Sequence, residues 1–268
     1  MVKEKKQRVV FIGAGNLATH LSKALQEAGH DIVQVFSRTA SSAQQLAGKL
    51  GCAMTTSIEA VRPDADIYIY SVSDAVLGEL FARTPLPDGA LCLHTAGSIP
   101  MSVFAPRCQR YGVFYPLQTF SKDRPVKFEE IPLFIEGSTP EVTATLREMG
   151  QEISRQVIEA SSEQRRHLHL AAVFACNFTN HLYAIAAKLL ERQGLPFDAL
   201  RPLIRETAAK IETLAPAAAQ TGPAMRYDRN VMQKHIDLLD DAEEKEIYRI
   251  LSKHIHQFAT SQIPSPHE

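Results

Sequence analysis

The 268-residue sequence predicts an α/β fold in which a doubly wound, mostly parallel sheet is followed by an all-helical C-terminal domain. Two observations support this prediction. Strand and helix patterns alternate with short connections over the first 160 residues, as a parallel sheet covered by helices requires. Beyond residue 160 only helical spacing persists. We therefore expect two domains, residues 1–160 and residues 161–268.

The first strand, turn and helix form the most informative stretch of the chain. Residues 9–12 are all apolar and predict a buried strand, and Asn16 opens a helix whose apolar residues recur at helical spacing. Gly13 and Gly15 lie between them, and a second strand, Asp31–Phe36, follows within the roughly 30 residues that such a unit needs. This arrangement predicts the first βαβ unit of a Rossmann-type dinucleotide-binding domain.

The glycine turn has the spacing Gly-x-Gly-x-x-Ala, from Gly13 to Ala18. In such a turn the first glycine takes a backbone conformation closed to other residues, and the second lets a pyrophosphate approach the backbone. The amides at the start of the following helix then face the anion. We expect Gly13, Gly15, Asn16 and Leu17 to bind the pyrophosphate. The alternative is a tight turn without a ligand.

The remaining elements are predicted from apolar alternation, helical spacing and turn residues. Further strands are expected at residues 52–54, 66–70, 90–93, 113–115, 131–136 and 156–158, with helices at 41–50, 101–110 and 140–149. The second domain is expected to contain helices at residues 163–192, 198–215, 229–240 and 241–257. Asp228 is expected to be the N-cap of the third of these helices. Residues 264–268 are expected to form a disordered tail.

Composition and charge exclude several classes of partner. The formal net charge is -1 and 22% of the residues are charged, so there is no general attraction to nucleic acid or to an anionic membrane. No uninterrupted apolar run approaches the roughly 20 residues that span a bilayer, and the lysine-rich first residues lack the apolar core of a signal peptide. We expect a cytoplasmic protein without nucleic-acid or membrane partners.

The four widely spaced cysteines favour buried free thiols over disulfides, and we expect no metal site.

The residues after the second strand bear on the choice between NAD and NADP. NAD-binding domains usually carry an acidic residue at the end of this strand, where it accepts hydrogen bonds from the ribose. The only nearby acid here, Asp31, stands at the beginning of the strand, and Ser37, Arg38 and Thr39 follow its end. Two hydroxyls beside a guanidinium suit a 2′-phosphate, so the pattern favours NADP. Alternatively, Arg38 is a solvated loop residue and the hydroxyls cap the next helix.

Small polar segments follow the fourth and fifth expected strands. In an open parallel sheet the ligand lies across the carboxyl ends of the strands, so we expect Val72, Ser73 and Thr95 to lie beside a nicotinamide ring. Asp74 is expected to be the N-cap of the next helix. His94 has two interpretations, a core histidine at a strand end or a residue of the pocket.

Three polar residues interrupt the apolar pattern of the helix expected at residues 163–192. At about 100° per residue, His169, Asn177 and Asn180 fall within an arc of roughly 80°. A polar cluster on a buried helix must be hydrogen-bonded to protein, to water or to a ligand. The cluster is therefore either part of a reactive site or a set of groups that satisfy one another across the core of a dimer.

Six short motifs occur in an order that spans nearly the whole chain. They are GAGNLATHL, LHTAGSIP, YPLQTFS, HLAAVFACNFTNHL, RETAAK and QTGPAMRYD. In combination they resemble a bacterial family of proteins classed as NADP oxidoreductases, which joins a Rossmann-like domain to a helical domain of unknown function. More distantly, the layout is similar to pyrroline-5-carboxylate reductases, relatives of 6-phosphogluconate dehydrogenase and deazaflavin-dependent NADP reductases. The resemblance implies a homodimer built through the helical domains, with an active site in the cleft between the two halves.

The sequence departs from the family pattern at two positions. Family members commonly have histidine where this chain has Tyr115, and glycine where it has Tyr227. The first departure excludes a histidine acid at that turn. Either Tyr115 substitutes for it or the acid lies elsewhere.

Together these observations predict an NADP-dependent oxidoreductase that transfers a hydride between NADP(H) and a small carbonyl, an imine or a second redox cofactor. The expected catalytic residues are His169, as the proton donor, and Asn177, as a relay. The expected cofactor-binding residues are Gly13, Gly15, Asn16 and Leu17 for the pyrophosphate, Ser37, Arg38 and Thr39 for the 2′-phosphate, and Val72, Ser73 and Thr95 for the nicotinamide. The alternative from another class is a non-catalytic redox sensor or regulatory protein that binds NADP(H).

Overall fold

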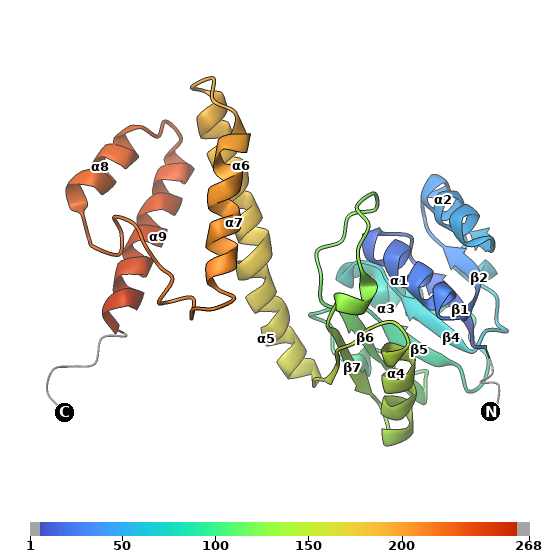
Figure 1. Ribbon diagram of the computed structural model, residues 1–268. Helices are drawn as coiled ribbons and strands as arrows, with labels where there is room; N and C mark the ends of the chain where they lie inside the picture. Colours follow the sequence, from blue (N-terminus) through green and yellow to red (C-terminus); the bar gives the residue numbers. More distant parts are fainter. Residues whose placement is uncertain (1–5, 262–268) are drawn as a thin grey trace, which may run out of the picture. The chain divides into compact units, whose positions relative to one another are not determined.

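The computed structural model describes residues 6–261, and the tail expected at residues 264–268 lies outside them. The first part of the chain, coloured from blue to yellow-green in Figure 1, is built on one eight-stranded sheet. The strands are β1 (Arg8–Ile12), β2 (Asp31–Phe36), β3 (Ala53–Thr55), β4 (Ile67–Tyr70), β5 (Leu91–His94), β6 (Arg110–Pro116), β7 (Leu133–Gly137) and β8 (Val157–Glu159).

The strands lie in the order β3-β2-β1-β4-β5-β6-β7-β8. Those from β3 to β6 are parallel, β7 runs antiparallel to β6, and β8 runs parallel to β7. The direction of strand order reverses between β1 and β4, which is the switch point where open α/β sheets bind their ligands. The predicted fold class, a doubly wound and mostly parallel sheet followed by helices, is confirmed.

Helices cover both faces of this sheet. They are α1 (Asn16–Glu27), α2 (Ala40–Leu50), α3 (Asp74–Arg83) and α4 (Pro140–Gln151). The buried side chains of α1, α2 and α4 belong to one apolar cluster, and those of α3 belong to a second cluster. Successive residues of β1 alternate between the clusters, because neighbouring side chains of a strand point to opposite faces. The inner strands β1 and β4 are mostly apolar because both faces of the sheet are covered there.

The prediction of a helix over residues 101–110 is wrong. Only a short 3₁₀ helix, Met101–Phe104, forms there, and β6 already begins at Arg110. Pro106 explains the difference, because proline has no amide hydrogen to continue an α-helical ladder. The connection between the parallel strands β5 and β6 therefore contains no α-helix in this structure.

A long helical stretch follows the last strand and begins with a capping box. The hydroxyl of Ser161 accepts a hydrogen bond from the Gln164 amide (3.2 Å), and the Gln164 side chain accepts one from the Ser161 amide (2.8 Å). The stretch consists of α5 (Ser162–Ala172), a π-helical turn (Val173–Phe178) and α6 (Thr179–Glu191).

The π-helical turn interrupts the regular helix expected at residues 163–192. A π-helical turn holds more residues than an α-helical one, so a constant 100° spacing does not apply across it. The arc expected for His169, Asn177 and Asn180 therefore does not describe how these side chains are arranged.

The chain divides into two compact units between Cys176 and Asn177. The strands end at Glu159, close to the boundary expected at residue 160. The first unit also keeps α5, because Arg165 of this helix is buried against residues that follow β5 and β7. The second unit contains only helices and turns in its described part.

The second unit begins with α6. It continues with a 3₁₀ helix (Phe197–Leu200), α7 (Arg201–Lys210), α8 (Arg229–Asp237) and α9 (Ala242–Ser261). α7 ends at Lys210, short of the expected residue 215, and turns follow it. The predicted N-cap of α8 is confirmed, because the Asp228 carboxylate accepts a hydrogen bond from the Val231 amide (3.2 Å).

Tyr227 stands in a left-handed backbone conformation, with φ of 54°. Within residues 6–261 no other residue except glycine has a positive φ. Left-handed geometry favours glycine, so Tyr227 adopts a backbone conformation that is unfavourable for a side chain of its size. The Tyr227 ring stacks on His256, with ring centroids 4.2 Å apart, and the Arg229 guanidinium lies 4.6 Å from the ring centroid. These contacts hold the tyrosine in its strained geometry.

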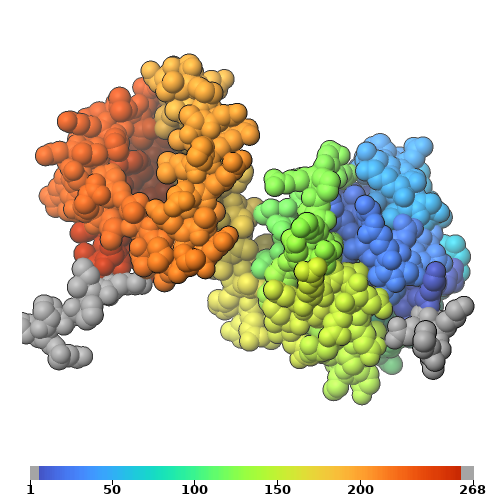
Figure 2. Space-filling view, in the orientation of Figure 1, coloured from blue at the N-terminus to red at the C-terminus, as the bar shows by residue number. Residues whose placement is uncertain are grey.

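The second unit has little core of its own. Among its described residues only Ala224, Leu239 and Glu244 are buried, and α6 and α7 contain no buried residue. In Figure 2 the surface of this unit is hollowed between its orange and red segments. The prediction of buried thiols holds for Cys92, whereas Cys52 and Cys108 are only partly buried and the prediction is wrong for Cys176, which is exposed. By length and composition alone, the 30-residue stretch Ser162–Glu191 could cross a membrane, since an 18-residue window within it has a mean hydropathy of 1.3.

Candidate cofactor-binding and active site

A cleft of about 580 Å³ opens at the carboxyl ends of the central strands. We call it the strand-end cleft. It is lined by residues that follow β1, β2, β4 and β5, by the end of β6, by the loop after β6 and by one residue of α5. All the cofactor-binding residues expected from the sequence line it: Gly13, Gly15, Asn16, Leu17, Ser37, Arg38, Thr39, Val72, Ser73 and Thr95. His169 lines it as well, and Asn177 does not.

The two glycines of the first turn meet different constraints. Gly13 has φ of +121°, and a Cβ built on it would lie 2.1 Å from the carbonyl oxygen of Ser71, so only glycine fits there. Gly15 has an ordinary φ of -78°, and a Cβ built on it would meet no atom within 4 Å. The space in front of Gly15 is therefore open at the N-terminus of α1. Such a space fits a pyrophosphate that must approach the backbone closely.

The first turn of α1 is left available to an anion. No side chain caps this helix, and its first turn contains no acidic residue. The Asn16 side chain instead donates a hydrogen bond to the Phe120 carbonyl oxygen (2.8 Å), and His20 Nε2 donates one to the Ser121 carbonyl oxygen (2.9 Å). These bonds fasten the loop after β6 to α1, and Figure 2 shows this green loop against the dark blue helix. Lys122, the next residue of the loop, also lines the strand-end cleft.

The guanidinium of Arg38 is exposed and makes no ion pair with any described residue. The carboxylates of Glu59 and Glu79 pair with Arg83 instead, at 2.7 and 2.8 Å. Arg38 therefore presents an uncommitted positive charge to the strand-end cleft. A guanidinium with free donors is well suited to a phosphate.

The hydroxyls on either side of Arg38 are not used to cap α2. Thr39 stands at the N-cap position of α2 without a side-chain capping bond, and the Ser37 hydroxyl accepts a hydrogen bond from the Thr39 amide (3.3 Å). Asp31 is the first residue of β2, at the end of the strand away from the cleft. No carboxylate from β2 therefore opposes a 2′-phosphate beside these hydroxyls.

The floor of the cleft at its other end comes from the segments after β4 and β5. The Thr95 hydroxyl donates a hydrogen bond to the Ser71 hydroxyl (3.3 Å), which joins the two segments. The prediction that Asp74 caps α3 is wrong, because Ser73 stands at the N-cap and Asp74 is the first helical residue. The Asp74 carboxylate instead accepts a hydrogen bond from the Ser98 hydroxyl. This bond further ties α3 to the loop after β5.

His94 is a core histidine. Its side chain is fully buried, its Nδ1 accepts a hydrogen bond from the Ala96 amide (3.2 Å), and its ring packs against Phe104. Burial, with a smaller effect of the Arg165 guanidinium, lowers the pKa of His94 to about 3. His94 is therefore neutral at physiological pH and does not line the strand-end cleft.

The end of β6 and α5 bring two titratable side chains together. The Tyr115 hydroxyl and His169 Nδ1 lie 3.0 Å apart, within hydrogen-bond distance. Gly97 provides the space for this contact, because a Cβ built on it would lie 2.6 Å from the imidazole ring. Burial raises the pKa of Tyr115, against a smaller opposing effect of Arg165, so the phenol keeps its proton at neutral pH.

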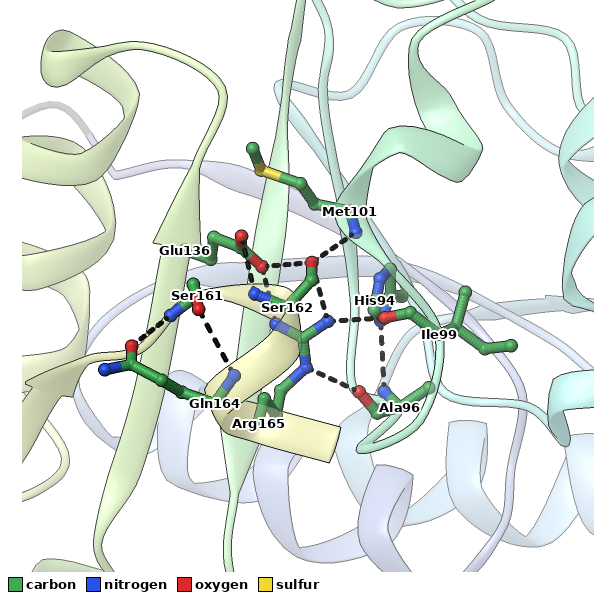
Figure 3. A network of polar contacts seen from close by, with 9 residues as sticks. All are labelled: His94, Ala96, Ile99, Met101, Glu136, Ser161, Ser162, Gln164 and Arg165. Atoms are coloured by element: carbon green, nitrogen blue, oxygen red, sulfur yellow. Dashed lines mark hydrogen bonds and ion pairs between the residues drawn. The ribbon is translucent and has the colours of Figure 1, made fainter. Parts of the chain in front are cut away.

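Arg165 of α5 and Glu136 of β7 form an ion pair within a network of polar contacts (Figure 3). Arg165 is only 1% exposed, and its Nη1 lies 2.6 Å from a carboxylate oxygen of Glu136. The guanidinium also donates hydrogen bonds to the carbonyl oxygens of Ala96 (3.2 Å) and Ile99. The same carboxylate accepts hydrogen bonds from the Ser162 amide (2.8 Å) and hydroxyl (2.6 Å). The network joins β7, the loop after β5 and the first turn of α5.

Sequence reasoning missed several residues of this arrangement. Asn177, expected as a relay, is exposed in the π-helical turn at the start of the second unit. Lys122, Gly97 and Arg165 contribute to the first unit's site without having been expected there. A glycine after a strand end is a signal that could have pointed to Gly97. Arg165 gives no such signal, because a charged residue near the start of a helix is usually solvated.

Other hollows of the first unit lack these features. One of about 930 Å³ lies among α1, α2, the loop after β6 and the end of α4, and no residue of the glycine turn lines it. Within residues 6–261 no group of three or more His, Cys, Asp or Glu side chains could hold a metal ion. The convergence of uncommitted donors with a Tyr–His pair occurs in the strand-end cleft.

Comparison with family models and solved structures agrees with this geometry. Residues 8–92 match the model described as "NADP oxidoreductase coenzyme F420-dependent", and residues 131–255 match "Domain of unknown function (DUF2520)". No curated protein gives a significant match to the chain.

Three solved structures illustrate the range of similarity. A Bacteroides fragilis protein classed as an NADP oxidoreductase is 50% identical over 94% of this chain and 98% of its own, with a TM-score of 0.89. An imine reductase from Myxococcus stipitatus, solved with NADP+, is 17% identical over 97% and 95% of the two chains, with a TM-score of 0.64. The 1-pyrroline-5-carboxylate reductase of Streptococcus pyogenes is 12% identical over 95% and 99%, with a TM-score of 0.62. The last two share the fold, whereas the first shows that this chain belongs to the NADP oxidoreductase family in which a Rossmann-type domain precedes a helical domain of unknown function.

Proposed function

We propose that this protein is an NADP-dependent oxidoreductase that reduces a small imine or carbonyl compound in the strand-end cleft. The observation that supports the proposal most is a single cleft lined by the open glycine turn, the uncommitted Arg38 and the Tyr115–His169 pair. When bound, NADPH supplies the hydride. The residues at one end of the cleft bind the phosphates of NADPH, and those at the other end donate a proton to the substrate.

Tyr115 is the source of the proton that the reduction requires. Its phenol is buried and protonated at neutral pH, so it can donate its proton to the oxygen or nitrogen that gains charge as the adjacent carbon accepts the hydride. His169, at 3.0 Å, can return a proton to the phenolate. The products are NADP+ and an alcohol or amine. Tyr115 thus takes the place of the histidine that family members commonly carry at this turn.

The first substrates to test are cyclic imines. Two solved structures with this fold are named an imine reductase and a pyrroline-5-carboxylate reductase, which makes a cyclic imine a reasonable first choice. We expect NADPH absorbance to fall when wild-type protein is mixed with a panel of cyclic imines, 2-oxo acids and flavins. Tyr115→Phe should lower the turnover of an active substrate by about 10²- to 10⁴-fold with little change in NADPH affinity. Tight binding of NADPH with no turnover on the whole panel would instead favour a redox sensor.

Arg38→Ala is expected to weaken NADPH binding by about 10- to 100-fold and to leave NADH affinity unchanged, since a charge-assisted bond to phosphate contributes about 1.5–3 kcal/mol. Calorimetric titration with both coenzymes measures the effect. Arg83→Ala is the matched control, because this nearby arginine is already paired with Glu59 and Glu79. Equal losses for NADPH and NADH would contradict the assignment of Arg38 to the 2′-phosphate.

We also propose that two copies of the chain associate through their helical units. A unit with three buried residues in its described part cannot hold a folded structure by its own core, and large apolar side chains such as Leu182 and Leu203 are 39% and 62% exposed. A second copy would cover these side chains. The charged residues Arg165, Arg166 and Lys188 within Ser162–Glu191 argue against the alternative that this stretch spans a membrane.

Light scattering after size-exclusion chromatography is expected to give the mass of a dimer. Leu182→Glu combined with Leu203→Glu should shift the protein toward the monomer, because charges would be buried at the interface. Met54→Glu, an exposed apolar position of the first unit, serves as the control and should leave the mass unchanged. A monomeric wild type, or wild type that floats with liposomes, would contradict the proposal.

A further inference from the structure

The first turn of α5 is tied to the sheet by the buried pair of Arg165 and Glu136. We infer that this pair is a positioning device that holds His169 in contact with Tyr115 at the reactive end of the strand-end cleft. The catalytic meaning of the inference rests on the proposed function, whereas the geometry it claims can be measured without a substrate.

The guanidinium makes bonds that no other side chain could make at once. It joins Glu136 of β7 at 2.6 Å, the Ala96 carbonyl oxygen at 3.2 Å and the Ile99 carbonyl oxygen. Figure 3 shows it between these three groups, with Ser162 closing the network. The planar fork of arginine donors suits such a set, and a lysine ammonium has neither the reach nor the fixed geometry. Three segments that are distant in sequence are thereby fixed at one point.

His169 follows Arg165 by four residues, so the two side chains lie on the same side of α5, one turn apart. The segment held by Arg165 at Ala96 and Ile99 contains Gly97, which receives the His169 ring. The helix that carries His169 and the loop that receives its ring are therefore both held by the Arg165 guanidinium. A functional side chain must be held within about 0.5 Å of its working position, and this attachment provides that restraint.

Stability alone does not account for the pair. A buried ion pair is often no more stabilising than well-packed apolar residues of similar volume, because both charges lose their hydration. What apolar residues could not do is bond the loop carbonyls and so fix α5 against the loop. The pair also places a positive charge near Tyr115, which favours the transient phenolate of the proposed reaction.

The test uses the full-length protein with ¹³C-labelled histidine. The His169 signal is identified among the ten histidines by its loss in His169→Asn. Arg165→Met combined with Glu136→Leu removes both charges, and Arg165→Lys keeps the charge but not the set of bonds. We expect both variants to move the ¹³C ring signals of His169 in the same direction as Tyr115→Phe does, because each loosens the contact between His169 Nδ1 and the Tyr115 hydroxyl.

Arg147→Met is the matched control, because it removes an ion pair with Glu159 at the same edge of the sheet without touching α5 or the loop after β5. It should leave the His169 signal unchanged. Unchanged His169 ring signals in folded Arg165→Lys, or in the folded double variant, would overturn the positioning role. The proposed function has a different test: it would be contradicted if the wild-type protein did not bind NADPH, whatever the His169 signals show.

Discussion

Gly13→Ala is expected to destabilise the first unit by about 3 kcal/mol or more. The added Cβ would lie 2.1 Å from a backbone carbonyl oxygen of Ser71, which cannot move aside as a flexible side chain could. The substitution also forces alanine into a φ of +121°, a conformation that costs about 1–3 kcal/mol outside glycine. Because β1 and β4 are adjacent inner strands of the sheet, their separation would disturb the core on both faces. Chemical denaturation followed by circular dichroism measures the loss.

Gly15→Ala is the matched control, and it separates stability from binding. This residue has an ordinary φ, and its Cβ would point into open space, so the free energy of unfolding should stay within about 0.5 kcal/mol of wild type. The methyl group would occupy the space assigned to the pyrophosphate, so NADPH affinity should fall by about tenfold or more. A large loss of stability with unchanged NADPH affinity would contradict this account of Gly15.

Arg165→Met is expected to lower the free energy of unfolding by about 3 kcal/mol. The substitution leaves the Glu136 carboxylate, 15% exposed, without its countercharge, and it removes the donors of two carbonyl oxygens. Removing one partner of a buried pair usually costs about 3–5 kcal/mol, and the remaining bonds from Ser162 place the expected value at the lower end. Thermal unfolding of the single variant should show the loss.

The second substitution tests the cause of this loss. Adding Glu136→Leu removes the uncompensated charge, so the double variant should recover most of the lost stability. If the double variant were as unstable as Arg165→Met, packing rather than the unpaired carboxylate would be responsible. A single variant as stable as wild type would show that Glu136 is not effectively buried.

Most of the sheet could be predicted from the sequence because its strands are locally distinctive. Residues 9–12 and the glycine turn are adjacent in sequence, so a short stretch of residues is enough to predict β1, the turn and α1 together. The helix expected at residues 101–110 does not form, because Pro106 interrupts the helical ladder that the apolar spacing predicts. The π-helical turn could not be predicted, because spacing alone assumes a regular helix.

The candidate site was only partly predictable, for a physical reason. The phosphate end of the cleft is made by short segments after β1 and β2, whose position follows from the fold. The reactive end depends on contacts between distant residues, such as Tyr115 with His169, 54 positions apart, and Arg165 with Glu136, 29 apart. No local pattern reports such a contact. The contact between Arg165 and Glu136 depends on the antiparallel pairing of β7 with β6, which places Glu136 beside α5.

Calorimetric titration of the wild-type protein with NADPH and with NADH tests the central claim most directly. The account predicts that NADPH binds in the glycine turn, with a dissociation constant in the range of about 1 μM to 1 mM typical of enzyme ligands, and at least about tenfold more tightly than NADH. Failure of the folded protein to bind either coenzyme would contradict the claim that the strand-end cleft is a dinucleotide site.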